Sequence, residues 1–149
     1  DSVHRCSCKQ SEIDSYKRKI SGPLMDRIDM QINLSRVEFS ELKTKEKGES
    51  SAAIRERVVK ARLLQQERLE ALGMHCNAQM GRSEVVKYCQ LDSAAQNVME
   101  RYFNMLNLSA RSHDRILKVA RTIADLAGSE NIEAVHLAEA IQLRTSVLP

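Results

Sequence analysis

Apolar residues recur at helical spacing through most of the second half of the chain. From Ser50 or Ser51 to Gly73 they form one row, which predicts a single long helix and comprises Ile54, Val58, Ala61, Leu69 and Leu72. Serine is a typical N-cap residue, and glycine is typical just beyond a helix end. This helix is longer than a small bundle requires, so we expect it to project or to span two units.

Four further helices are predicted after a loop at residues 74–83. They cover 83–89, 93–106 after Asp92 or Ser93 as cap, 109–128 between Ser109 and Gly128, and a last helix that begins near Glu133. The buried row expected on the 109–128 helix is Ile116, Ala120, Ile123 and Ala127. Residues 50–149 are therefore predicted to form a self-sufficient helical domain.

The first 37 residues follow a different pattern. A short helix is expected at 11–20, capped by Ser11 and stopped by Gly22-Pro23, and strict apolar–polar alternation predicts a strand at 28–34. Residues 35–49 are polar and charged, typical of a connector. A single strand has no hydrogen-bond partner, so we expect this part to be the last piece of a larger α/β domain whose other strands lie upstream.

Composition narrows the picture only a little. The chain has 149 residues, 42% of them hydrophobic but only 3% aromatic, so its core must be aliphatic, which suits packed helices. The net charge of +3 is too mild to indicate nucleic acid by itself. The sequence shows no signal peptide and no membrane-spanning run, so we expect a cytoplasmic protein with reduced cysteines and no membrane partner.

Catalytic motifs are missing from the sequence. It contains no G-x-x-x-x-G-K-[ST], G-x-G-x-x-G, H-E-x-x-H or G-x-S-x-G, and its four histidines are scattered. Cys76 and Cys89 fit packing roles better than ligand roles. Cys6 and Cys8 could supply two thiolates, but structural zinc usually takes four ligands.

Two arginines are candidates for anion binding. Arg111 lies in the first turn of its helix, where free N–H groups and the helix dipole favour phosphate; a solvated basic face with Arg115 and Lys118 is the alternative. Arg27 lies between Asp26 and Asp29. These acids either hold it in weak surface ion pairs or point it at something outside the subunit.

Four strings in register make the chain similar to a known family. "ISGPLMDRID", "GESSAAIRERV", "CNAQM" and "LSARSHDRILKVARTIADL", followed by "HLAEAIQLR", resemble the C-terminal part of magnesium-chelatase-like AAA+ ATPases. The nearest branch is the competence-associated ComM/YifB type, and the resemblance runs from about Cys6 to Arg144. It implies a mainly α fold, in which a helical-bundle lid domain at 50–149 follows a connector at 38–49 and a helix–strand remnant of the α/β AAA+ core at 1–37.

The resemblance also implies roles for single residues. Arg27, in the "DRID" string, resembles the arginine finger that reaches into the ATP site of a neighbouring subunit. Arg111, in "LSAR", resembles sensor 2, which contacts nucleotide phosphate. The helix at 50–72 resembles the insert that precedes sensor 2, and Cys6 and Cys8 resemble half of a four-cysteine zinc site, not expected to be filled here.

Cofactors and partners follow from the same resemblance. The full-length protein is expected to bind ATP and Mg²⁺, to form a ring of identical subunits and to remodel DNA, as in branch migration during natural transformation. The family's ATP-binding motifs would lie upstream of Asp1, so the fragment by itself is expected to be inactive and without a cofactor.

Two alternatives remain open at this point. Helices 83–89 and 93–106 could mimic a helix-turn-helix in a free-standing DNA-binding module, although the second carries only Arg101 as a basic residue. A purely structural adaptor bundle is the other alternative.

Overall fold

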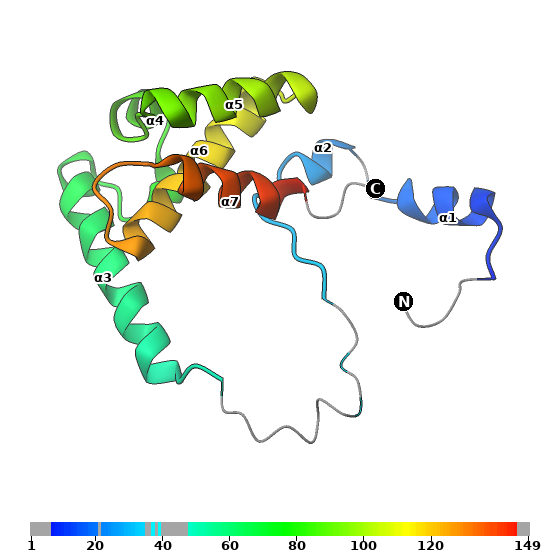
Figure 1. Ribbon diagram of the computed structural model, residues 1–149, viewed down its shortest axis with the longest axis horizontal. Helices are drawn as coiled ribbons and strands as arrows, with labels where there is room; N and C mark the ends of the chain where they lie inside the picture. The colour runs from blue at the N-terminus through cyan, green and yellow to red at the C-terminus, as the bar shows by residue number, and fades with distance from the viewer. Residues whose placement is uncertain (1–6, 21, 35–36, 38, 40–47, 146–149) are drawn as a thin grey trace.

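A computed structural model describes residues 7–20, 22–34, 37, 39 and 48–145 as a mainly helical chain (Figure 1). The helices are α1 (Gln10–Lys17), α2 (Gly22–Met25), α3 (Ser51–Leu69), α4 (Arg82–Tyr88), α5 (Ser93–Met105), α6 (Ala110–Ala127) and α7 (Ala134–Thr145). Short 3-10 turns cover Glu70–Leu72 and Asn77–Gln79. In the described ranges the β pairing is one isolated bridge, Leu91 to Ile132. The mainly α fold class is therefore confirmed.

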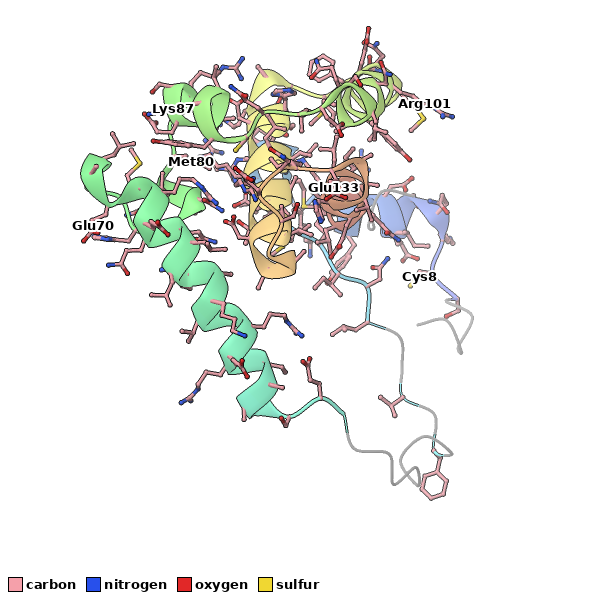
Figure 2. The ribbon with its side chains drawn as sticks, turned by 60° about the vertical axis from the view of Figure 1, so that its left-hand side comes forward. Cys8, Glu70, Met80, Lys87, Arg101 and Glu133 are labelled. Atoms are coloured by element: carbon pink, nitrogen blue, oxygen red, sulfur yellow. The ribbon has the colours of Figure 1, made fainter. Side chains whose placement is uncertain are left out.

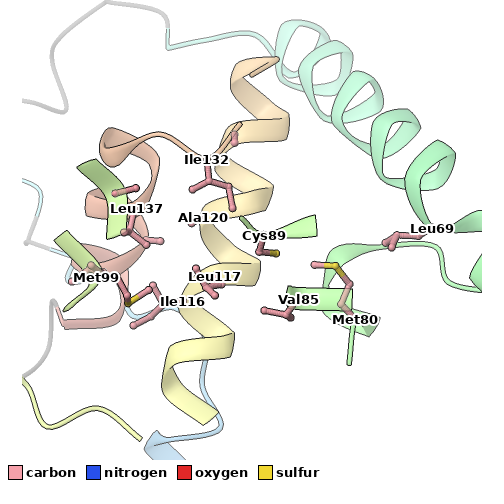
Figure 3. Packing of buried hydrophobic residues seen from close by; sticks show 14 residues of the cluster. Leu69, Met80, Val85, Cys89, Met99, Ile116, Leu117, Ala120, Ile132 and Leu137 are labelled. Carbon is pink, nitrogen blue, oxygen red and sulfur yellow. The ribbon is translucent and has the colours of Figure 1, made fainter. Parts of the chain in front are cut away.

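Helix α6 is the centre of the bundle. It packs against α3, α4 and α7, and α7 also packs against α5 (Figure 1). The buried cluster around α6 is aliphatic, as the low aromatic content predicts, and its largest fully buried apolar members are Leu69, Met80, Val85, Ile116, Ile132, Leu137 and Ile141 (Figure 3). None of the helices described is long and apolar enough to cross a membrane.

Local capping chemistry fixes the ends of the long helices. The side chains of Ser50, Asp92 and Ser109 each accept a hydrogen bond from the backbone N–H three residues on. Gly73 and Gly128 end their helices in the left-handed region, at φ 68° and 71°. The predicted boundaries of α5 and α6 are thus confirmed within one residue, whereas α3 ends at Leu69 and the last three residues of its predicted range form a 3-10 turn before Gly73.

Helix α3 leaves the bundle at its N-terminal end, as its predicted length suggested (Figure 1). Of the predicted apolar row, Ala61 and Leu69 are buried, whereas Ile54 and Val58 remain 41% and 43% exposed. Ile54 and Val58 lie on the same row of the helix, nearer its N-terminus, but the described chain does not bury them. The N-terminal half of α3 is therefore an unpacked helix within the described chain.

Three expectations from the sequence are corrected. Residues 28–34 are irregular instead of a strand, because no described strand runs beside them to complete a ladder; Gln31 N bonds instead to the carbonyl of Leu143 on α7 (2.6 Å). Gly22-Pro23 starts the short helix α2 instead of only stopping α1, since proline suits a first helical turn. On α6, Ala127 is exposed, and the buried row turns toward Leu117, Arg121 and Asp125.

A buried polar network joins α3, α6 and the Asn77–Gln79 turn. Arg68 contacts the Asp125 carboxylate through both guanidinium ends, at 3.0 and 2.6 Å, and Asn77 Nδ2 donates to it at 2.8 Å. Arg121 Nε donates to the same carboxylate at 3.1 Å and uses its other nitrogens on the carbonyls of Ser129 and Glu130. The "CNAQM" string therefore has a structural role, because Asn77 anchors the loop after α3 to α6.

Candidate functional site

The segment Asp26–Asp29 lies where the start of α6 meets the end of α7. The Asp26 carboxylate accepts hydrogen bonds from Ser112 Oγ (2.9 Å) and Ser109 Oγ (3.4 Å), both in the first turn of α6. It also pairs with Arg144 Nη2 of α7 at 3.1 Å. One carboxylate from the N-terminal segment thus connects two helices of the bundle.

Two arginines hold the backbone of the same segment. Arg115 Nη1 on α6 donates to the carbonyl of Arg27 at 2.6 Å and pairs with the Asp29 carboxylate. Arg144 Nη1 donates to the carbonyl of Ile28 at 2.8 Å, and its Nη2 lies 3.4 Å from the carbonyl of Asp26. Three consecutive carbonyls are therefore held by side chains of α6 and α7.

The Arg27 side chain stays at the surface of this junction. It is exposed, and its Nη1 donates to the carbonyl of Pro23 at 3.1 Å, across one turn of chain. Arg111 is also exposed, on the first turn of α6, and its charge reaches Asp26. The two arginines singled out from the sequence thus both lie at this junction.

The rest of the predicted basic face is engaged in contacts within the chain. Arg115 binds the Asp26–Asp29 segment, and Lys118 Nζ donates to the carbonyl of Ala78 at 3.3 Å. The start of α6 meets an internal anion, Asp26, through the hydroxyls of Ser109 and Ser112. Of this basic face, Arg111 is the side chain that the structure leaves exposed.

The junction depresses the pKa of Asp26. The hydrogen bond from Ser112 lowers the pKa most, burial opposes it, and Arg144, Ser109 and Arg111 lower it further. A carboxyl group whose pKa falls on folding stabilises the fold above its unfolded pKa, and this contribution is lost as the pH falls through the folded pKa.

We expect Asp26→Asn to lower the free energy of unfolding mainly above about pH 4, near the pKa of an unfolded aspartate. Because the lost bonds require the carboxylate, the difference in free energy of unfolding between variant and parent should become smaller as the pH falls below that value. Urea titrations from pH 2.5 to 6 measure this difference, and Asp14→Asn on the exposed helix α1 serves as the control. A difference in free energy of unfolding that stays constant with pH contradicts a stabilising role for the ionised Asp26 carboxylate.

A cavity of about 410 Å³ opens beside the junction. Its polar lining includes Asp26, Ser109, Ser112 and Arg144, and its apolar lining includes Met25 and Leu108. Because Arg144 is already paired with Asp26, the wall offers no free cation to a phosphate. The cavity is therefore a poor anion site, and the surface arginines are the better candidates.

The cysteines are spread over the molecule. Cys8 is exposed just before α1 (Figure 2), Cys76 is half-buried, and Cys89 lies in the core, where burial raises its pKa to about 11. Cys6 lies outside the described residues. Within the described ranges there is no cluster of three or more histidine, cysteine or acidic side chains that could hold a metal ion. The half zinc site of Cys6 and Cys8 stays a prediction.

Together, the fold and the junction define a helical domain that fixes a short arginine-bearing segment against its last two helices, α6 and α7. The chain belongs to the magnesium chelatase subunit ChlI family. The model for the C-terminal part of this subunit matches residues 48–144, and the model for the subunit itself matches residues 1–42.

Curated relatives cover almost the whole chain. Competence protein ComM of Haemophilus influenzae is 39% identical over 137 residues, which is 91% of this chain and 26% of ComM. YifB of Escherichia coli is 37% identical over 142 residues, 95% of this chain and 27% of YifB, and YifB of Salmonella typhimurium is 36% identical with the same coverage. The chain thus spans about a quarter of the length of the relatives it matches.

Sequence reasoning missed the residues that build the junction, Ser112, Arg115 and Arg144. A signal for Arg144 existed, because it continues the buried row of α7 through Leu137, Ala140 and Ile141 at helical spacing. A charged residue at a core position indicates a buried partner. Arg115 offered no such signal, since it fits an ordinary basic face.

Proposed function

We propose that this chain is the arginine-finger segment and helical lid of a magnesium-chelatase-like AAA+ ATPase. In this proposal Arg27 acts on the ATP of a neighbouring identical subunit in a ring, and Arg111 contacts nucleotide phosphate as sensor 2. Residues 1–37 belong to the ATPase core, 38–49 connect the two parts, and 50–149 form the lid. The family membership supports the proposal.

The observation that carries the proposal is the pair of exposed arginines at one junction. Surface arginines suit phosphate, because the guanidinium fork donates to two oxygens at once. Arg27 is carried on a segment whose backbone is fixed, and Arg111 lies exposed on the first turn of α6. Both side chains remain available to a ligand that approaches from outside this chain.

Cofactor chemistry in this proposal is supplied elsewhere in the full-length protein. ATP and Mg²⁺ would bind where the family's nucleotide-binding motifs lie, and this sequence has no G-x-x-x-x-G-K-[ST]. When ATP is bound there, Arg27 would stabilise charge that develops on its γ-phosphate. The 149-residue chain alone is expected to show no ATP turnover.

DNA is the substrate class that the proposal assigns to the full-length protein. Its support is the likeness to ComM, which is named a competence protein. In natural transformation the motor would drive branch migration of incoming DNA, in the cytoplasm. Stimulation of ATP hydrolysis by branched DNA, compared with linear duplex of the same length, tests this part.

Arg111→Ala in the full-length protein tests sensor 2. Loss of a charge-assisted phosphate contact should weaken ATP binding or turnover by about 10- to 100-fold. Calorimetric binding and steady-state hydrolysis measure the two effects. Arg101→Ala is the matched control, because Arg101 is an exposed arginine on α5 (Figure 2). If the parent and Arg111→Ala show equal ATP affinity and equal turnover, Arg111 belongs to a solvated basic face and is not sensor 2.

A further inference from the structure

We infer that Arg115 and Arg144 are positioning residues, which lock the arginine-finger segment to the lid so that Arg27 moves with helices α6 and α7. The inference rests on the proposed function of Arg27 and extends it to the regulation of that site. Lid orientation, set by α6 and α7, would then decide where Arg27 is presented.

The contacts form a clamp on the backbone itself. The carbonyls of Asp26, Arg27 and Ile28 are all bonded by Arg115 or Arg144, and Gln31 N donates to the carbonyl of Leu143 on α7 at 2.6 Å. Side-chain contacts alone would let the backbone pivot. Bonds to successive carbonyls from two helices fix its direction, and hence the direction in which the Arg27 side chain leaves it.

Burial indicates that the clamp resists opening. The Arg144 side chain is only 8% exposed, and its Nη2 also contacts Ser112 Oγ at 3.0 Å, which in turn binds Asp26. Separating the segment from the lid would break the bonds of the Arg144 guanidinium to the Asp26 carboxylate and to the carbonyls of Asp26 and Ile28 together. The low-energy response to a lid movement is therefore for the segment to follow.

Local hydrogen exchange tests the clamp in the 149-residue chain. In Arg115→Gln and Arg144→Gln, the amides of residues 26–31 should exchange about tenfold faster, because charge-assisted bonds that restrain them are lost. The matched control is Arg82→Gln, since Arg82 pairs with Asp114 on α6 and does not contact the segment in any described bond. Unaltered exchange in the peptides of α3 and α6 verifies that each variant is folded.

Arg115→Gln is the decisive variant, since its side chain is 27% exposed and its loss does not leave a buried charge. If exchange at 26–31 is unchanged in a folded Arg115→Gln chain and in Arg144→Gln, the clamp is refuted. The Arg144→Gln change could also unfold the end of α7. Circular dichroism distinguishes this loss of helix from release of the 26–31 segment.

Hydrolysis by the full-length protein tests the positioning role. Arg115→Gln should lower kcat about tenfold at an unchanged KM for ATP, because Arg27 is displaced while the nucleotide site is intact. Arg115→Lys should recover part of kcat, since an ammonium can still donate to the Arg27 carbonyl. Arg82→Gln should behave as the parent does.

The outcomes separate this inference from the proposed function. If Arg27→Ala abolishes turnover but Arg115→Gln loosens the segment without changing kcat, positioning is overturned and the finger role stands. If Arg27→Ala leaves kcat unchanged, the finger role fails and the positioning role fails with it. Faster exchange, lower kcat and rescue by lysine together support the inference.

Discussion

Arg27→Ala in the full-length protein should lower ATP hydrolysis by about 10³- to 10⁵-fold, the range associated with an arginine finger. Nucleotide binding should stay nearly intact, because a finger acts on charge that develops only in the transition state. The fold should also survive, since the Arg27 side chain is exposed and its one described bond is to the nearby carbonyl of Pro23.

Two further variants sharpen this test. Arg27→Lys keeps the charge but loses the bidentate fork, so it should recover only a small part of the activity. Arg18→Ala removes another exposed arginine that bonds a carbonyl one turn away, that of Asp14, and should leave turnover unchanged. Normal hydrolysis by Arg27→Ala would show that this arginine is only a surface residue.

Mixing experiments add the subunit test. If Arg27 acts across a subunit boundary, inactive Arg27→Ala subunits mixed with subunits that lack a working nucleotide site should regain activity. Each kind of subunit then supplies what its neighbour lacks. No recovery in the mixture, with assembly verified by size, argues against action in trans.

Helix ends could be predicted because their chemistry is local. A serine or aspartate bonds the N–H three residues on, and a glycine adopts the left-handed conformation, whatever the rest of the chain does. Ser109 and Gly128 therefore delimited α6 from sequence alone. The same is true of Gly73 at the end of the turn after α3.

The predicted strand at 28–34 shows the opposite case. Alternation of Ile28, Met30, Ile32 and Leu34 describes a segment with one apolar side, but a strand exists only when a partner supplies its hydrogen bonds. Here Ile32 and Leu34 are 68% and 91% exposed. The pattern identified a face that would be covered in a sheet, yet periodicity alone could not say what covers it.

The junction was only half predictable for a related reason. Arg27 and Arg111 were found through strings that resemble a family, whereas Arg115 and Arg144 act through bonds to a backbone more than 80 residues away in the chain. Long-range contacts between a side chain and a carbonyl leave no local pattern. The buried position of Arg144 on α7 was the one usable sign.

Asp125→Ala should destabilise the chain by about 3–5 kcal/mol, the range for breaking a buried ion pair from one side. Its carboxylate is fully buried and receives hydrogen bonds from Arg68, Arg121 and Asn77. Burial lowers the pKa of Arg121, and the charge of Asp125 opposes that shift. Asp125 therefore offsets part of the free-energy cost of burying the Arg121 charge. A loss of this size is a large fraction of the stability of an ordinary domain.

Urea unfolding followed by circular dichroism measures the effect, and Asp114→Ala provides the control. Asp114 is also an α6 aspartate paired with an arginine, but its partner Arg82 is 65% exposed, so the loss of Asp114 should change stability by at most about 1 kcal/mol.

Neutralisation of buried charge by Asp125 also predicts non-additive effects on stability. Arg121→Met combined with Asp125→Ala should cost less than the sum of the single changes, because the double variant no longer leaves the Arg121 guanidinium buried without its carboxylate. Simple additivity would mean that Asp125 stabilises the fold by packing and not by neutralising buried charge.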